Sequence, residues 1–270
     1  MANSKTLVCV HAHPDDEAIF TAGISSHYAA LGYDVVLVTC TNGRLGFDDL
    51  NRAGDSPQHD DLVTISTRAS ELQRSAALVG FSRIVTLGLD DSGMVGWPQN
   101  ENPRAFMNCD VDNVARTLAA LLDEVHATVV VTYDENGFYG HPDHVMANVV
   151  TRRALDFAES PQRLYYPVVP RGAIKGFVDQ AQQEGFTLPR FILEADFGIP
   201  DELLATTVDV TEYVGTKQSA LRTHSSQTDN ADLIAMEPKL FALMFGTEWF
   251  QRVWSRHEAR HDATDLFGGL

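Results

Sequence analysis

The segment TLVCVHAHPDDE, residues 6–17, opens as an unbroken apolar run and closes as a cluster of ionisable side chains. The apolar run is rich in β-branched residues, as is typical of a strand that is buried on both faces of a parallel sheet. Two histidines and three carboxylates follow where this strand should stop and a helix should start. They form either a solvated helix start, which the helix dipole favours, or part of a metal site.

Further segments of the first half alternate between strand-like and helix-like patterns. Runs with the same apolar, β-branched character predict strands at residues 34–41, 83–89 and 127–134. Segments that predict helices lie between and after them, at residues 17–31, 61–80, 112–126 and 142–158. This alternation predicts an α/β fold with a doubly wound, mostly parallel, Rossmann-like sheet.

The second half of the chain is less regular. Residues 163–169 and 205–213 predict strands, and residues 213–223 predict a helix. The stretch at 170–202 is rich in Gly and Pro and shows no clear period. We interpret it as an irregular excursion that borders the active site.

The C-terminal end, residues 258–270, predicts an irregular or extended segment. The chain contains neither an internal repeat nor a linker that forces a domain boundary. We therefore expect a single domain over residues 1–270. Its metal-binding α/β core spans 1–160, and a C-terminal, substrate-side portion spans 161–270.

The formal net charge of −17 restricts the partners of this protein. Binding to nucleic acid or to anionic lipid needs a basic face, so the charge argues against both. The cysteines Cys9, Cys40 and Cys109 lie far apart without a C-x-x-C pair, which is typical of free thiols in a reducing compartment. With neither a signal-peptide core nor a membrane-spanning run, the sequence predicts a cytoplasmic protein. A small-molecule substrate suits this composition, and a homo-oligomer is compatible with it.

A second cluster, YDENGFYGHPDH at residues 133–144, follows the fourth predicted strand. Ligands of open α/β sheets bind outside the carboxyl ends of the strands, so both clusters should reach the same rim. Either cluster alone is explained by a helix start. Together they favour a metal site with these candidate ligands: His13, Asp15, Asp16, Glu17, His141, Asp143 and His144.

The residue types of the two clusters suit a catalytic rather than a structural metal. Imidazole and carboxylate together suit a borderline ion such as zinc, and a catalytic zinc keeps three protein ligands and an open position. A carboxylate and a histidine then remain as general base and general acid. The residue types alone do not decide whether Asp15 or Asp16 is the base. Glu17 is expected to start the following helix.

The two clusters together resemble those of the PIG-L/LmbE-like superfamily of zinc-dependent N-deacetylases. The likeness covers most of residues 5–160 and returns near ALRTHSSQTD at 220–229. Within the superfamily, the chain is most similar to the mycothiol branch, which holds the N-acetylglucosaminyl-inositol deacetylase and the mycothiol S-conjugate amidase. The shared features are DSGM at 91–94, VVTYDENG at 130–137 and TDLFGGL at 264–270.

The resemblance implies a zinc site formed by His13, Asp16 and His144. It makes Asp15 the general base that activates water. Iron(II) would accept the same ligands, so both metals are compatible with the site.

The resemblance also implies roles for residues around the metal. His141 would protonate the leaving amine or stabilise the oxyanion, and Asp143 would orient the His141 ring. Tyr139 matches a tyrosine that helps to polarise the carbonyl oxygen. Arg68 and His224 match residues that contact the substrate.

One part of the first cluster departs from the family pattern. Many relatives carry Ser or Thr where this chain has Ala18, and the S-conjugate amidases tend to have lysine where it has Phe20. Because Ile19 and Phe20 are apolar, the wall of the substrate pocket should differ here. The loop 42–60 is either a substrate-side lid or a plain solvated loop.

The resemblance implies a zinc-dependent hydrolase that cleaves the N-acyl amide of a glucosamine-type sugar, such as N-acetylglucosaminyl-inositol. Two alternatives keep amide hydrolysis: a mycothiol S-conjugate amidase acting on a thiol conjugate, and a natural-product tailoring deacetylase or amidase. An alternative of another class is a non-catalytic metal- or sugar-binding module. The absence of a G-x-S-x-G elbow in the sequence argues against a serine hydrolase.

Overall fold

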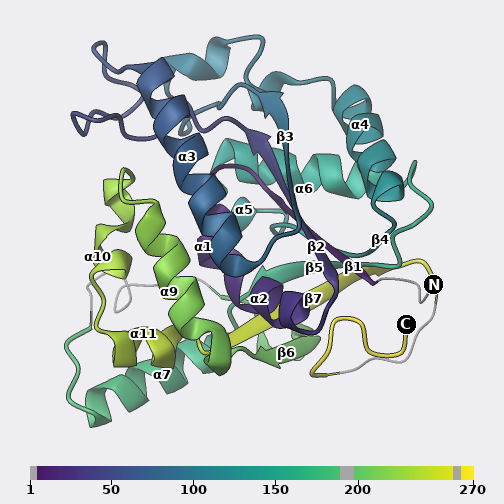
Figure 1. Ribbon diagram of the computed structural model, residues 1–270, viewed down its shortest axis with the longest axis vertical. Coiled ribbons are helices and arrows are strands. Elements are labelled where there is room, and N and C mark those ends of the chain that lie inside the picture. Colours follow the sequence, from purple (N-terminus) through teal and green to yellow (C-terminus); the bar gives the residue numbers. More distant parts are fainter. Residues whose placement is uncertain (1–4, 189–197, 258–262) are drawn as a thin grey trace.

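The computed structural model describes residues 5–188, 198–257 and 263–270. Its centre is a seven-stranded sheet with the strand order β3-β2-β1-β4-β5-β7-β6 (Figure 1). The strands are β1 (Thr6–His11), β2 (Asp34–Thr41), β3 (Arg83–Leu89), β4 (Ala127–Val131), β5 (Arg163–Val168), β6 (Thr206–Asp209) and β7 (Thr247–Ser255). The first six lie within segments that the sequence predicts as strands.

The order in which the chain adds strands to the sheet reverses between β1 and β4: β2 and β3 extend the sheet on one side of β1, and β4 and β5 extend it on the other. β1 pairs in parallel with β2 on one side, from Thr6 opposite Asp34 to His11 opposite Thr39, and with β4 on the other. Only β7 runs against its neighbours, β5 and β6, among the described strands. The predicted mostly parallel, doubly wound sheet is confirmed. The reversal makes the carboxyl ends of β1 and β4 the place where sheets of this kind bind ligands.

Helices cover both faces of the sheet (Figure 1). Alternate residues of β1 enter two separate cores, with Val8 and Val10 on one side and Leu7 and Cys9 on the other. The first core is covered by α4 (Val111–Glu124) and α6 (Pro142–Ala154). The helices on the opposite side are α1 (Asp16–Phe20), α2 (Ala22–Ala30) and α3 (Asp61–Val79). Burial on both faces explains why the strands are apolar without interruption.

A third apolar cluster joins helices from the second half to the start of α1. The stretch 170–202, expected to lack regular structure, begins with a helix instead. Ile174, Phe177, Val178 and Ala181 recur at helical spacing, and Ala181 is buried in this cluster. Residues 189–197 of that stretch lie outside the described residues. The helices not yet named are α5 (Gly137–Gly140), α7 (Arg171–Gln183), α9 (Val214–Thr223), α10 (Ala231–Ile234) and α11 (Pro238–Phe245).

Two further elements differ from the prediction. The single helix expected at 17–31 is divided at Thr21, whose hydroxyl contacts His11 Nε2 at 2.8 Å. β7 was not predicted because its sequence, TEWFQRVWS, mixes aromatic with charged residues, and most of the strand is only half-buried. Short 3₁₀ turns complete the secondary structure at Pro98–Glu101, Phe106–Asn108, Asp201–Leu203, Thr211–Tyr213 and Thr228–Asn230. Within the described ranges, we find no helix with both the length and the apolar character to cross a membrane.

The C-terminal residues 263–270 are part of the core rather than a loose end. Leu266 and Phe267 are completely buried beside β1 and α2. The guanidinium group of Arg163, itself buried in β5, donates hydrogen bonds of 2.8 Å to the carbonyl oxygens of Leu266 and of Gly268. Residues 263–270 contain bends and turns but neither helix nor strand, so the expected irregular end is confirmed for the described residues, and the buried Arg163 donor holds it in place.

We expect Arg163→Ala to lower the free energy of unfolding by about 3–5 kcal/mol, because it leaves buried carbonyl oxygens unpaired and opens a cavity. Urea unfolding monitored by circular dichroism measures the change. Arg83→Ala is the control, since it removes an exposed ion pair with Glu124 and should cost less than about 1 kcal/mol. Equal losses in the two variants would contradict an anchoring role for Arg163.

Candidate metal centre and active site

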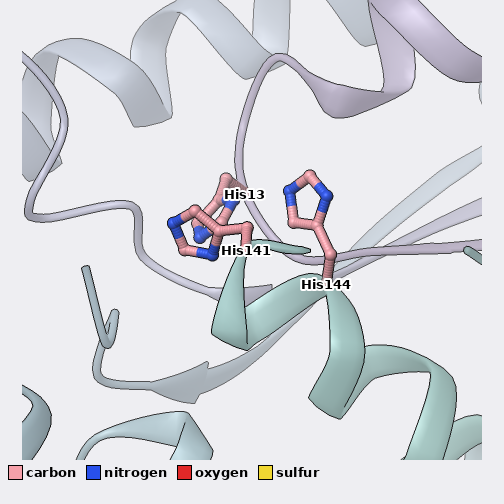
Figure 2. Close-up of side chains that lie close together, drawn as sticks. All are labelled: His13, His141 and His144. Atoms are coloured by element: carbon pink, nitrogen blue, oxygen red, sulfur yellow. The ribbon is translucent and has the colours of Figure 1, made fainter. Parts of the chain in front are cut away.

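The two predicted clusters meet at the carboxyl ends of β1 and β4 (Figure 1). His13 lies in the loop that follows β1, while His141 and His144 lie at the start of α6. One donor nitrogen from each of these three histidines lies within 4.8 Å of the other two. Figure 2 shows the three rings gathered in one place. Segments more than a hundred residues apart therefore supply one site.

The Asp16 carboxylate lies between two of these histidines. Its Oδ2 is 3.4 Å from His13 Nδ1, and its Oδ1 is 3.4 Å from His144 Nε2. Burial alone would raise the pKa of Asp16, but the neighbouring imidazole groups of His144 and His13 outweigh that effect and hold its pKa well below the usual value. The structure thus brings together the three ligands that the sequence predicts: His13, Asp16 and His144.

His144 is oriented as a metal ligand would be. Its Nδ1 lies 3.2 Å from the carbonyl oxygen of Gly137 and can donate only there, which leaves a lone pair on Nε2. That Nε2 is buried and has no hydrogen-bond partner within the described structure. A buried acceptor beside a carboxylate and a second imidazole fits a divalent cation, so the residues present suit a metal.

A second group of carboxylates surrounds the other side of His13. Asp143 Oδ2 is 3.2 Å from His13 Nε2, and Asp91 Oδ1 is 3.8 Å from it. Burial lowers the pKa of His13, but Asp91, Asp143 and Asp16 outweigh that effect and raise the pKa well above its usual value. The role of Asp91 was not predicted, although its position begins the quoted DSGM motif. These carboxylates orient His13 or add a ligand to the same centre.

Asp143 does not contact His141 in the way that was expected. Its Oδ2 accepts from the Ser92 backbone N–H at 2.9 Å as well as facing His13. His141 caps α6, and its Nδ1 accepts the backbone N–H of Asp143 at 3.1 Å. The backbone N–H of Asp143 therefore orients the His141 ring, because the Asp143 carboxylate already contacts His13.

Asp15 has a backbone conformation that is uncommon for a residue with a side chain. Its φ is 108° and its ψ is −28°, in the left-handed region. The carboxylate lies 3.2 Å from the Arg68 guanidinium and accepts a 3.2 Å hydrogen bond from Asn230. Burial raises the pKa of Asp15 to about 7 even though Arg68 opposes the shift. Strain of this kind persists where the surroundings hold a functional group in place.

Glu17 lies in the first turn of α1, as expected, and its side chain also holds the backbone of Asp15 in place. The Glu17 side chain is fully buried, and its Oε2 accepts the backbone N–H of Asp15 at 2.9 Å. Its Oε1 lies 2.7 Å from His224 Nε2 and also accepts the hydroxyl of Ser75. Burial lowers the pKa of His224, but the Glu17 charge reverses the effect and raises it.

His224 therefore lies behind the site and not on its surface. It was expected to contact the substrate, yet it is 0% exposed and does not line the cavity described below. Its partner Glu17 separates it from Asp15. The described structure supports an indirect role, in which His224 fixes Glu17.

Tyr139 and His141 lie on the open side of the centre. Tyr139 is 58% exposed, and its ring lies 5.0 Å from that of His144. Burial, followed by the nearby imidazole groups of His13 and His144, lowers the pKa of His141 to about 2, so its ring is neutral. The preceding Phe138 has a φ of 66°, which interrupts the short helix α5 at this point.

A cavity of about 460 Å³ opens over these residues. Arg68 lines it and also donates to the carbonyl oxygen of Gly43 at 2.9 Å, so the guanidinium ties the loop 42–60 to the site. That loop lines the cavity through Leu45, Gly46, Phe47 and Ala53. Polar residues that were not predicted complete the wall near Asp15: Gln227, Asp229 and Asn230. Gln227 and Asp229 lie within the quoted ALRTHSSQTD stretch and Asn230 directly follows it, and this stretch was the only signal for them.

The model of the family described as "GlcNAc-PI de-N-acetylase" (PIG-L) matches residues 8–155. A curated 1D-myo-inositol 2-acetamido-2-deoxy-alpha-D-glucopyranoside deacetylase from Geodermatophilus obscurus is 35% identical and covers 100% of this chain and 99% of its own length. A protein of the same name from Acidothermus cellulolyticus is 38% identical, with coverage of 98% and 95%.

Solved structures with a similar fold include enzymes of different chemistry. N,N'-diacetylchitobiose deacetylase from Pyrococcus horikoshii has a TM-score of 0.61 at 20% identity, covering 93% of this chain and 84% of its own. GalB, the 4-carboxy-2-hydroxymuconate hydratase from Pseudomonas putida KT2440, has a TM-score of 0.60 at 17% identity, with coverage of 96% and 100%. At these identities the likeness concerns the fold alone.

We expect Glu17→Ala to lower the free energy of unfolding by about 3–5 kcal/mol, because His224 stays buried without its counter-charge. Glu17→Gln keeps the size and one acceptor oxygen and should lose less. Chemical unfolding of the metal-free protein measures both. Glu124→Ala, which breaks an exposed ion pair, is the matched control and should change stability by less than about 1 kcal/mol. A Glu17→Ala variant as stable as this control would show that the buried pair is not structural.

Proposed function

The chain belongs to the GlcNAc-PI de-N-acetylase (PIG-L) family, and on that premise we propose that it is a metal-dependent hydrolase. Its reaction is removal of the acyl group from the amide of a glucosamine-type sugar, of which N-acetylglucosaminyl-inositol is the first candidate. The two similar deacetylases described above are named for a substrate of this kind. One observation carries the proposal: the buried Nε2 of His144 has no hydrogen-bond partner in the described structure and faces Asp16 Oδ1 at 3.4 Å, while the strained Asp15 lies two residues after His13.

We assign the metal to His13, Asp16 and His144. Two imidazoles and one carboxylate suit zinc, and iron(II) accepts the same set. When bound, such an ion polarises the amide carbonyl and makes water more acidic. The four carboxylates of the surroundings, Asp15, Asp16, Asp91 and Asp143, supply the negative charge that a divalent cation needs.

Asp15 is the general base of this proposal. Arg68 and Asn230 hold its two carboxylate oxygens, and Glu17 holds its backbone N–H. A base that is fixed in this way accepts a proton from the attacking water without first reorganising. The water oxygen bonds to the carbonyl carbon, and the C–N bond then breaks as the proton taken up by Asp15 passes to the leaving nitrogen, which gives a carboxylate and the free amine.

His141 is placed to act on the carbonyl oxygen or the amine. Since its Nδ1 accepts the Asp143 N–H, the ring hydrogen of the neutral imidazole lies on Nε2. A neutral donor of this kind stabilises an oxyanion, and Tyr139 offers a second donor at the same cavity. These residues and Arg68 line the space where the substrate amide would lie.

We place this reaction in the cytoplasm. Cys9, Cys40 and Cys109 are all free, and the first two are buried. Free thiols of this number suit a reducing compartment. The substrate-side residues Gln227, Asp229 and Asn230 come from the second half of the chain, so we treat residues 1–270 as one functional domain.

We expect Asp15→Ala to keep its metal and to lose activity by roughly 10²–10⁴-fold, the usual contribution of a general base. His144→Ala should lose both the metal and the activity, because it removes a ligand. Metal content by inductively coupled plasma mass spectrometry and product formation by mass spectrometry measure the two effects.

The substrates of the assay are N-acetylglucosaminyl-inositol, a mycothiol S-conjugate and N-acetylglucosamine. Faster cleavage of the cysteinyl–glucosamine bond would identify an S-conjugate amidase instead of a deacetylase. Parental activity in Asp15→Ala would overturn the mechanism. A metal-loaded parent protein that cleaves none of the three would favour a binding module.

A further inference from the structure

A second cavity of about 260 Å³ lies next to the reaction cavity. Its walls come from α7, α11 and the strands β5 and β7, which belong to the second half of the chain. The lining is almost entirely apolar, and it includes Ile174, Phe177, Phe245 and Trp249. Nothing in the proposed hydrolysis of an acetyl group uses this space.

The two cavities share part of their walls. Ile19, Phe20 and Phe138 line both of them. The Phe20 ring lies 6.1 Å from the ring of His144 and 5.1 Å from that of Phe138. The apolar cavity therefore adjoins the reaction cavity at these three residues. Its wall contains the apolar Ile19 and Phe20, which directly follow the HPDDE cluster and Ala18.

The charged groups of the second cavity neutralise each other. Lys217 Nζ lies 2.6 Å from Glu248 Oε1, and both side chains are buried. Glu248 also accepts the backbone N–H groups of Gly23 and Ile24, at 3.0 and 2.9 Å. With both charges already paired, the cavity offers no free charge to an ionic ligand, and its apolar walls suit hydrocarbon.

The reaction cavity has a polar side around Asp15 and an apolar, aromatic side around His144. Arg68 and Asn230 contact Asp15, and hydroxyl groups of a sugar find donors and acceptors there. Phe20 and Tyr139 instead lie against His144. An N-acylated sugar has a polar half and an acyl half that meet at the amide. Its acyl half therefore belongs on the side of Phe20 and the second cavity.

We propose that the second cavity receives the hydrocarbon chain of the acyl group, so that the protein also cleaves aminosugars acylated with an unbranched alkanoyl chain longer than acetyl. This inference rests on the proposed hydrolase function and specifies its substrate class. Hydrolysis adds one water across the amide C–N bond and releases an alkanoate and the amine of the sugar. Ile19, Phe20 and Phe138 then determine specificity by guiding the chain from one cavity to the other.

A series of glucosaminyl-inositol substrates with acetyl, butanoyl, hexanoyl, octanoyl and decanoyl groups tests the proposal with the zinc-loaded protein. We expect kcat/KM to rise by roughly fourfold per added methylene, as the burial of a CH₂ group predicts, until the cavity is full. Ala173 lines the second cavity and not the first, so Ala173→Phe should remove the rise and leave acetyl hydrolysis unchanged. Lys175→Phe places the same ring on an exposed position of α7 outside both cavities and should keep the rise.

Binding provides a second readout that does not need turnover. Calorimetry should show tighter binding of N-octanoylglucosamine than of N-acetylglucosamine to the parent protein, and no such preference in Ala173→Phe. Hydrolysis of the acetyl substrate with rates that fall along the series would overturn the inference and leave the proposed function intact. If no member of the series were cleaved, the proposed function would fail. The binding measurement would then test the inference by itself, and equal affinities for N-octanoylglucosamine and N-acetylglucosamine would overturn it.

Discussion

The parallel pairing of β1 with β4 is the constraint on which the remaining structure depends. The two strands are more than a hundred residues apart in the chain, yet their carboxyl ends adjoin at the point where the strand order reverses. The loop after β1 delivers His13 and Asp16, and the loop after β4 leads to His144. Neither loop alone supplies enough ligands for a catalytic cation. The proposed metal site is thus a property of the sheet and not of either motif.

Behind this centre lies a layer of buried ionic groups that holds it in shape. Glu17 connects the backbone of Asp15 to His224, and Arg68 connects the Asp15 carboxylate to the loop at Gly43. Burying such ionic groups costs more free energy than burying apolar residues of the same size. In return, the carboxylate of Asp15 is fixed in a left-handed backbone conformation next to the metal ligands. A fixed base is the kind of preorganisation on which hydrolytic sites depend.

The same fold can carry different reactions, as the likeness to both a deacetylase and a hydratase shows. Specificity therefore depends on the residues that surround the centre. In this chain, those residues form a polar wall around Asp15 and an apolar wall around Phe20. The helices α7 and α11, far along the sequence, extend the apolar wall into a separate cavity. In the proposed function, the second half of the chain thus shapes the specificity of the centre that the first half supplies.

The sequence by itself determined the parallel strands β1 to β5, because residues buried on both faces of a sheet must be apolar throughout. It also determined which residues could bind a metal, because the two histidine clusters follow strands whose ends share a rim. The tertiary structure decided what sequence spacing does not encode: Asp143 faces His13 rather than His141, Glu17 is paired with His224, and Asp91 joins the centre. It also placed β7 and the C-terminal residues in the core. Local patterns record burial and periodicity, whereas these contacts join side chains that only the packed chain brings within hydrogen-bonding distance.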